Sequence, residues 1–277
     1  MKHTVYALGL VLPFVPLAPA RAQLPVTSGL VMWLSGDDDV EEAIGDPAEN
    51  SDGVVRWLDQ SSAANHVVTN APVATDTPTY RTGIANGHSA VEFGIDRDTE
   101  RLQASTPVLT GTTDFSLFAL IRLERTVGAR YIAGNYGGGN GAGLEFFVQN
   151  GSLGLYNLGG FTGTAVLDTN QWYLVYAEKS GGTYTLRVNG ALDGSSTAPG
   201  GSIGGGRNWT VSNGPDYISE TFYGDIALYL VYTNALTASD RLLVENYLLN
   251  EYGLVPEPAV VVLLGAGGLV LRWRRRK

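Results

Sequence analysis

The chain contains no cysteine, and this absence excludes a disulfide framework, thiolate zinc sites and thiol nucleophiles. Charge is also sparse, because only 16% of the 277 residues are Asp, Glu, Lys or Arg, whereas 44% are hydrophobic. That hydrophobic content is sufficient for a core of ordinary size, and the length suits one all-β sandwich domain. The domain must therefore be stabilised by its core and by backbone hydrogen bonds.

Basic residues are scarce between the two ends of the chain, where Lys179 is the single lysine. Without residues 1–22 and 254–277, the chain keeps 11 of its 18 basic and 26 of its 27 acidic residues, a net charge of −15. A domain this acidic does not bind nucleic acid or an anionic membrane through bulk electrostatics. It can attract divalent cations.

Residues 1–22 have the features of a secretory signal peptide. Lys2 and His3 form a short polar start, residues 5–15 are mostly apolar, and Ala20-Arg21-Ala22 fits a small-x-small cleavage site. The alternative is an N-terminal membrane anchor, but the apolar run is short and broken by prolines. We therefore expect the general secretion machinery to export the chain.

Residues 254–277 form a distinctive tail, in which Pro256-Glu257-Pro258 leads into the apolar run 259–271. Thirteen helical residues span about 20 Å, less than the roughly 30 Å of a bilayer core. The longer segment 254–273 can cross as a transmembrane helix if its arginines snorkel. The basic residues that follow predict a cytoplasmic end and place the middle of the chain outside; they are Arg272, Arg274, Arg275, Arg276 and Lys277.

This order of motif, short hydrophobic helix and basic end resembles the PEP-CTERM sorting signal of Gram-negative bacteria. The resemblance implies recognition by an exosortase and processing near Pro256-Glu257-Pro258. It also implies an inner-membrane intermediate, followed by delivery to the cell surface or extracellular matrix. A plain C-terminal membrane anchor is the alternative.

Residues 23–253 predict one β domain, because short alternating or apolar runs are separated by Gly, Asn, Asp and Ser clusters. One helix is expected near the C-terminus, with a capping box at Thr237–Asp240 and a stop at Gly253, packed on the sandwich edge. Residues 37–53, 70–87 and 200–206 are expected to be loops. The expected strands cover residues 30–34, 54–58, 90–93, 115–123, 131–134, 143–149, 153–156, 172–179, 184–188 and 222–232.

Several segments of this region are similar to LamG-like jellyroll domains of the concanavalin A-like lectin/glucanase group. The resemblance implies an all-β fold, a two-sheet antiparallel jellyroll sandwich with a short C-terminal helix, in addition to the hydrophobic sorting helix of the tail. The segments that carry it are 29–34, 55–61, 90–93 followed by Leu102, 171–175, 186–190, 224–228 and 232–237.

No residue is assigned to catalysis. Glucanase relatives use a Glu-x-Asp-x-x-Glu strand motif, which the chain lacks, and Glu92 stands alone on its strand. Residues 94–101 alternate acids with arginines and indicate a solvated turn. His66 and His88 lie among Asn, Gly and Ser without a nucleophile motif. A glycoside hydrolase on the same fold is therefore the least favoured function.

Calcium is the one cofactor that the sequence leaves open. Acidic residues are concentrated between Asp37 and Asp52, but their spacing does not fit an EF-hand, and a solvated acidic loop is the simpler interpretation. Asp225 is a second candidate, by analogy with related jellyrolls alone.

Aromatic side chains are the natural sugar-binding groups. Trp33, Trp57 and Trp172 alternate with apolar residues and are expected in the core. Tyr136, Trp209 and Tyr217 follow Gly- and Asn-rich segments, and they form the candidate ligand rim.

The sequence thus predicts an exported surface or matrix protein whose jellyroll binds a glycan or another matrix partner. The main alternative is a structural component of the biofilm or envelope without a specific ligand.

Overall fold

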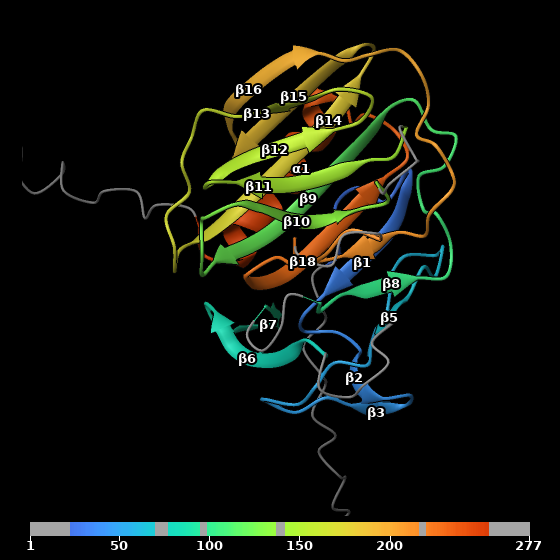
Figure 1. Cartoon of the computed structure of the whole chain (residues 1–277). Helices are drawn as coiled ribbons and strands as arrows, with labels where there is room; N and C mark the ends of the chain where they lie inside the picture. The colour runs from blue at the N-terminus through green and yellow to red at the C-terminus, as the bar shows by residue number, and fades with distance from the viewer. Residues whose placement is uncertain (1–22, 70–76, 95–98, 137–141, 216–219, 255–277) are drawn as a thin grey trace, which may run out of the picture.

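The computed structural model describes residues 23–69, 77–94, 99–136, 142–215 and 220–254. In these residues the chain forms two antiparallel β-sheets that pack face to face, with one α-helix (Figure 1). The expected two-sheet sandwich with a short C-terminal helix is confirmed. Residues 1–22 and 255–277, which hold the predicted signal peptide and sorting tail, lie outside the described residues.

The first sheet, sheet A, is built around β9 (Phe115–Leu123) and β18 (Gly224–Tyr232), which pair along most of their length. On the other side of β18, β1 (Leu30–Ser35) and β7 (His88–Phe93) pair with successive halves of that strand. The first strand of the domain is thereby joined to the last. The remaining strands of sheet A are β6 (Thr79–Ala85), β14 (Trp172–Ser180), β15 (Thr183–Val188) and β16 (Ala191–Thr197).

The second sheet, sheet B, joins shorter strands from distant parts of the sequence. Its spatial order is β13 (Gly160–Thr162), β12 (Ser152–Tyr156), β11 (Glu145–Gln149), β10 (Ala129–Gly134), β17 (Thr210–Val211), β8 (Leu102–Ala104), β5 (Val67–Thr69), β4 (Arg56–Trp57), β2 (Val40–Ala43) and β3 (Asp46–Pro47). The two-residue strand β17 links the two halves of the sheet.

The main core lies between the inner faces of the two sheets. Strand alternation places Phe115, Leu117 and Ala119 of β9 against residues such as Phe146 and Val148 of β11, all fully buried. Burying each such large side chain contributes about 1.5–3 kcal/mol. This core is the main source of stability in a domain without disulfides.

The helix α1 (Ala238–Glu251) covers the outer face of sheet A. Thr237 is its N-cap, since its hydroxyl accepts a hydrogen bond from the Asp240 amide, and the predicted cap is confirmed. Val244 and Leu248 pack in a second buried cluster with outward-facing residues of sheet A such as Phe118. The helix therefore packs on a sheet face and not on the sandwich edge, because that face of β9, β14 and β18 is itself apolar.

Leu24 and Leu254, at the two ends of the folded domain, both join this helix-side cluster. Both ends of the domain therefore lie on the outer side of sheet A, the side opposite sheet B.

Each expected strand overlaps a strand of the structure, but several further short strands were not expected. Residues 37–53, expected as a loop, contain β2 and β3, and residues 70–87 contain β6. These strands lie near sheet edges and carry few large apolar side chains, so their pairing leaves little signal in the sequence. No helix of the described residues is long and apolar enough to span a bilayer.

Candidate functional site

One transverse row of side chains crosses the outer face of sheet B, away from the core. Antiparallel pairing aligns Glu41, Arg56, Val68, Gln103, Thr210, Gly134, Glu145, Tyr156 and Gly160 in neighbouring strands. Aligned residues of a sheet share a face, and the residues adjacent to them, such as Trp57, Val67 and Phe146, are in the core. The centre of the row is closed, because Thr210 is fully buried. Its two ends are the candidate sites.

An open pocket of about 390 Å³ lies at the first end, over β4, β5 and β8. We call it the β4–β5–β8 pocket. Its walls combine neutral hydrogen-bonding side chains with the exposed isopropyl group of Val68. The lining residues are Arg56, Ala64, His66, Val68, Gln103, Ala104, Ser105 and Asn208.

The buried carboxylate of Asp59 holds the loop that forms one wall of this pocket. Asp59 Oδ1 accepts from the Trp33 amide at 2.7 Å and from the Ser61 amide at 2.8 Å. Its Oδ2 accepts from the Ser61 hydroxyl at 2.8 Å and from the Asn65 amide at 2.7 Å. The segment 55–61 that carries the family resemblance is thus a structural element, which fixes the backbone on both sides of Ala64.

The orientation of His66 follows from the same loop. Its Nδ1 accepts a hydrogen bond from the Asp59 amide at 3.0 Å, so the neutral ring carries its proton on Nε2. Arg56 is held by two hydrogen bonds to Glu41, of 2.6 and 2.9 Å, and this pairing keeps the pKa of Glu41 below its usual range. The arginine charge in the pocket wall is therefore already neutralised, which leaves a pocket suited to neutral polar ligands.

The second end of the row carries aromatic side chains around one carboxylate. We define the aromatic patch as Tyr136, Glu145, Phe147 and Tyr156, all half-buried. The rings of Tyr136 and Tyr156 meet edge to face, with centroids 4.7 Å apart. Phe147 lies over Gly154, where an added Cβ would come within 2.3 Å of its ring, and Tyr156 leans over Gly160 in the same way. Glycine at these positions lets the rings lie flat on the sheet.

Two buried asparagines fix the backbone beside these tyrosines. Asn135 donates to the Gly204 carbonyl at 3.0 Å and accepts from the Leu144 amide at 2.9 Å. Asn157 donates to the Ala142 carbonyl at 2.8 Å, and its side-chain oxygen accepts from Lys179 Nζ at 3.3 Å. Because Tyr136 and Tyr156 each adjoin one of these anchors, the aromatic patch is preorganised.

Glu145 lies within the aromatic patch without a compensating cation among the described residues. Burial raises the pKa of Glu145 to about 7, and the nearby Glu220 carboxylate adds to the rise. The Tyr156 pKa is also raised, first by its hydrogen bond to Tyr136 and then by burial.

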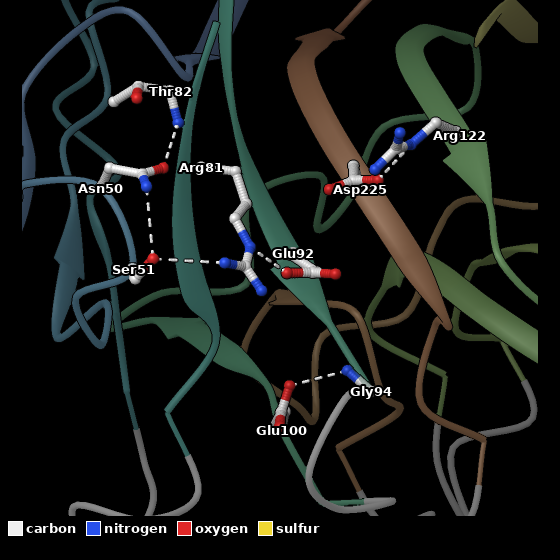
Figure 2. Close-up of polar contacts among 9 residues, drawn as sticks. All are labelled: Asn50, Ser51, Arg81, Thr82, Glu92, Gly94, Glu100, Arg122 and Asp225. Atoms are coloured by element: carbon white, nitrogen blue, oxygen red, sulfur yellow. Dashed lines mark hydrogen bonds and ion pairs between the residues drawn. The ribbon is translucent and has the colours of Figure 1, made fainter. Parts of the chain in front are cut away.

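A cluster of charged side chains lies on the outer face of sheet A, on β7, β18 and β9 (Figure 2). Glu92 of β7 and Asp225 of β18 are cross-strand partners, so Glu92 is not isolated in the fold as it is along its own strand. Figure 2 shows each carboxylate paired with a different arginine. Arg122 bonds Asp225 at 2.6 Å, and Arg81 bonds Glu92.

This carboxyl pair does not form a catalytic site. Asp225 is fully buried and Glu92 is 6% exposed, so a substrate cannot reach between them. Glu100, expected in a solvated turn, is 2% exposed and accepts from the Gly94 amide, so that expectation is wrong for Glu100 (Figure 2). Residues 95–98 of the same segment lie outside the described residues.

Buried carboxyls make the folded domain most stable in mild acid. Burial raises the pKa of Asp225 to about 6, against the opposing effect of Arg122. The folded state then holds protons that the unfolded chain loses between about pH 4 and 7, so the free energy of unfolding falls as pH rises through that range. Asp225 alone accounts for about 2–3 kcal/mol. Thermal melts should give a higher midpoint near pH 5 than near pH 8, and the opposite trend would contradict this prediction.

In the acidic segment 37–52, which left calcium binding open, Asp37 and Asp39 make contacts within the domain. Asp37 accepts from the Ser89 amide at 2.8 Å and pairs with His88, whose other ring nitrogen lies 3.1 Å from the Glu251 carbonyl. Asp39 accepts from Gln60 at 3.0 Å. Asp225, the second calcium candidate, faces Arg122 instead. Within the described ranges, no three His, Asp or Glu side chains are grouped to hold a metal ion.

The predicted rim divides into three outcomes. Tyr136 lies in the aromatic patch, and Tyr217 lies outside the described residues. The exposed position expected for Trp209 is wrong, because the ring is fully buried between the sheets. Trp57 is fully buried as expected, whereas Trp33 and Trp172 pack beside α1 and are partly buried.

Sequence reasoning missed the pocket residues and Glu145. The side-chain alternation of residues 152–156 could have predicted the outward position of Tyr156, because it places Tyr156 on the face opposite Leu155.

A model of the concanavalin A-like lectin/glucanases superfamily matches residues 96–240, more than half of the chain. The chain belongs to this superfamily. The matched range runs from before β8 into α1, and the β4–β5–β8 pocket joins it to strands that precede it. No curated protein matches this chain in sequence.

Solved structures show the same fold at low identity. The receptor-binding domain of the botulinum neurotoxin C/D mosaic serotype aligns with a TM-score of 0.52 and 12% identity, covering 80% of this chain and 52% of that one. The binding domain of botulinum neurotoxin DC in complex with SialylT aligns with a TM-score of 0.51 and 13% identity, covering 80% of this chain and 52% of that one. Botulinum neurotoxin type C, whose cell entry depends on interaction with two ganglioside molecules, aligns with a TM-score of 0.51 and 11% identity. The alignment covers 79% of this chain and 51% of that one. The chain spans about half the length of these toxin chains.

Proposed function

We propose that this protein is an exported carbohydrate-binding module whose β4–β5–β8 pocket binds a glycan outside the cell. The observation that carries the proposal is the pocket itself, which sets side-chain hydrogen-bonding groups around the apolar surface of Val68. A sugar presents the complementary surface, hydroxyl groups around apolar C–H faces. The neutral His66 ring and the paired Arg56 favour an uncharged segment of glycan in this pocket.

The superfamily supports this function, because it includes lectins. The toxin structures of the same fold support it too, since their ligands include SialylT and gangliosides. The pocket is held by the buried Asp59 network, so little ordering is needed on binding.

The same proposal includes surface sorting through the C-terminal tail. The Pro256-Glu257-Pro258 motif, the apolar run and the basic end support recognition by an exosortase. All of the described strands and α1 lie within residues 23–254, so cleavage near the motif would leave the described fold complete. The expected destination is the cell surface or extracellular matrix of a Gram-negative bacterium.

Binding to a glycan array, followed by calorimetry on the best ligand, tests the carbohydrate function. Asn208→Ala removes a pocket side chain and should weaken binding about three- to tenfold, the value of one hydrogen bond. Asn246→Ala makes the same change on the exposed side of α1 and should have no effect.

Absence of binding across the array would favour a structural matrix role. Binding that Asn208→Ala leaves unchanged would place the site elsewhere. Hydrolysis of the ligand during the measurement would favour the glycosidase alternative.

A further inference from the structure

The aromatic patch is separate from the β4–β5–β8 pocket but lies on the same face. Val68 and Glu145 belong to the same transverse row, and four strand steps separate β5 from β11. At about 4.8 Å a step, the separation is about 19 Å. One extended polymer can therefore contact both places.

The patch presents a carboxylate whose charge is not balanced. None of the ion pairs formed by described residues involves Glu145, and the group nearest to it in electrostatic effect is another carboxylate, Glu220. A half-buried anion in this setting gains most from a ligand that brings a positive charge.

The tyrosine and phenylalanine rings around Glu145 favour the same kind of ligand. Aromatic faces attract cations and also stack on the apolar faces of sugar rings. Phe147 and Tyr156 lie flat on glycines, so their outer ring faces are directed away from the sheet. Rings and carboxylate together suit a sugar that carries an ammonium group.

We propose that the aromatic patch binds a saccharide bearing protonated amines, with Glu145 pairing the ammonium group and Tyr156 and Phe147 stacking on the sugar ring. This inference rests on the proposed carbohydrate function and names the class of glycan. An anionic glycan is excluded from the patch by Glu145 and Glu220 and by the acidic net charge of the domain. A neutral sugar hydrogen-bonds Glu145 but leaves its charge unbalanced.

Two oligosaccharides of equal length and linkage test the proposal, a fully deacetylated β-linked glucosamine oligomer and its N-acetylated form. Binding of each to the full folded domain is measured by calorimetry near pH 7, where Glu145 is about half ionised and part of the amines is protonated, so that pairing favours both charged forms. The deacetylated oligomer should bind more tightly, and added salt should reduce the difference. Glu145→Gln should weaken its binding about ten- to a hundredfold, as expected for loss of a charge-assisted bond. Binding of the N-acetylated oligomer should hardly change.

Glu251→Gln is the matched control, because it makes the same substitution on the exposed end of α1, behind sheet A. Glu145→Gln removes an unpaired, half-buried charge and should not lower the melting temperature, so lost binding cannot be attributed to unfolding. Equal affinity for both oligomers, or binding unaffected by Glu145→Gln, overturns the ammonium inference and leaves the carbohydrate function intact. If neither these oligomers nor any array glycan binds, both proposals fail.

Discussion

Replacing Asp59 by alanine should lower the free energy of unfolding by about 3–5 kcal/mol and abolish ligand binding in the β4–β5–β8 pocket. The carboxylate is 5% exposed and accepts four hydrogen bonds, from Trp33, Ser61 (two) and Asn65. Without it, three backbone amides lose their partners and the loop that carries His66 is released. The expected loss is a large part of the 5–15 kcal/mol typical of a domain. Urea denaturation followed by Trp fluorescence measures it.

Asp46→Ala is the control for this prediction, because Asp46 is an exposed carboxylate on the edge strand β3, and its replacement should change stability by less than about 0.5 kcal/mol. Asp59→Asn keeps one acceptor oxygen and should fall between the two. If Asp59→Ala is as stable as the wild type, Asp59 does not hold the loop in solution.

Replacing Pro256-Glu257-Pro258 by three alanines should stop C-terminal processing in a host that encodes an exosortase. The mass of the mature wild-type protein should correspond to a chain without the signal peptide and without the C-terminal tail. The variant should lose the signal peptide, keep its C-terminal segment and stay in the inner membrane, because the hydrophobic run and basic end remain.

Intact-protein mass spectrometry of membrane and surface fractions distinguishes these outcomes. Conversion of Arg274 to lysine, which keeps the basic charge, is the matched control. If wild type and variant both retain the tail, the segment is a plain membrane anchor and the sorting proposal fails.

The sequence was informative where one strand or helix carries its own pattern. β9 is apolar at seven of its nine residues, and the Thr237 cap and Gly253 stop are local signals, so these elements were predicted almost to the residue. The Gly-rich turns likewise indicated the β11–β12 hairpin.

Features that depend on distant pairing were not predictable from single residues. Trp209 follows glycine and asparagine and resembles a surface residue, but it precedes β17, which pairs with β10 and β8 and carries the ring into the core. The β4–β5–β8 pocket likewise requires the register of three short strands. Glu92 and Asp225 are 133 positions apart and meet only through the pairing of β7 with β18.

The position of the domain ends has a consequence for the proposed attachment to a cell surface. Leu24 and Leu254 lie with α1 on the outer side of sheet A, whereas the β4–β5–β8 pocket and the aromatic patch lie on the outer side of sheet B. An attachment through either end therefore holds the domain from the side of α1 and the outer face of sheet A. In such an attachment the outer face of sheet B is directed away from the attachment surface, and the two proposed ligand sites stay accessible.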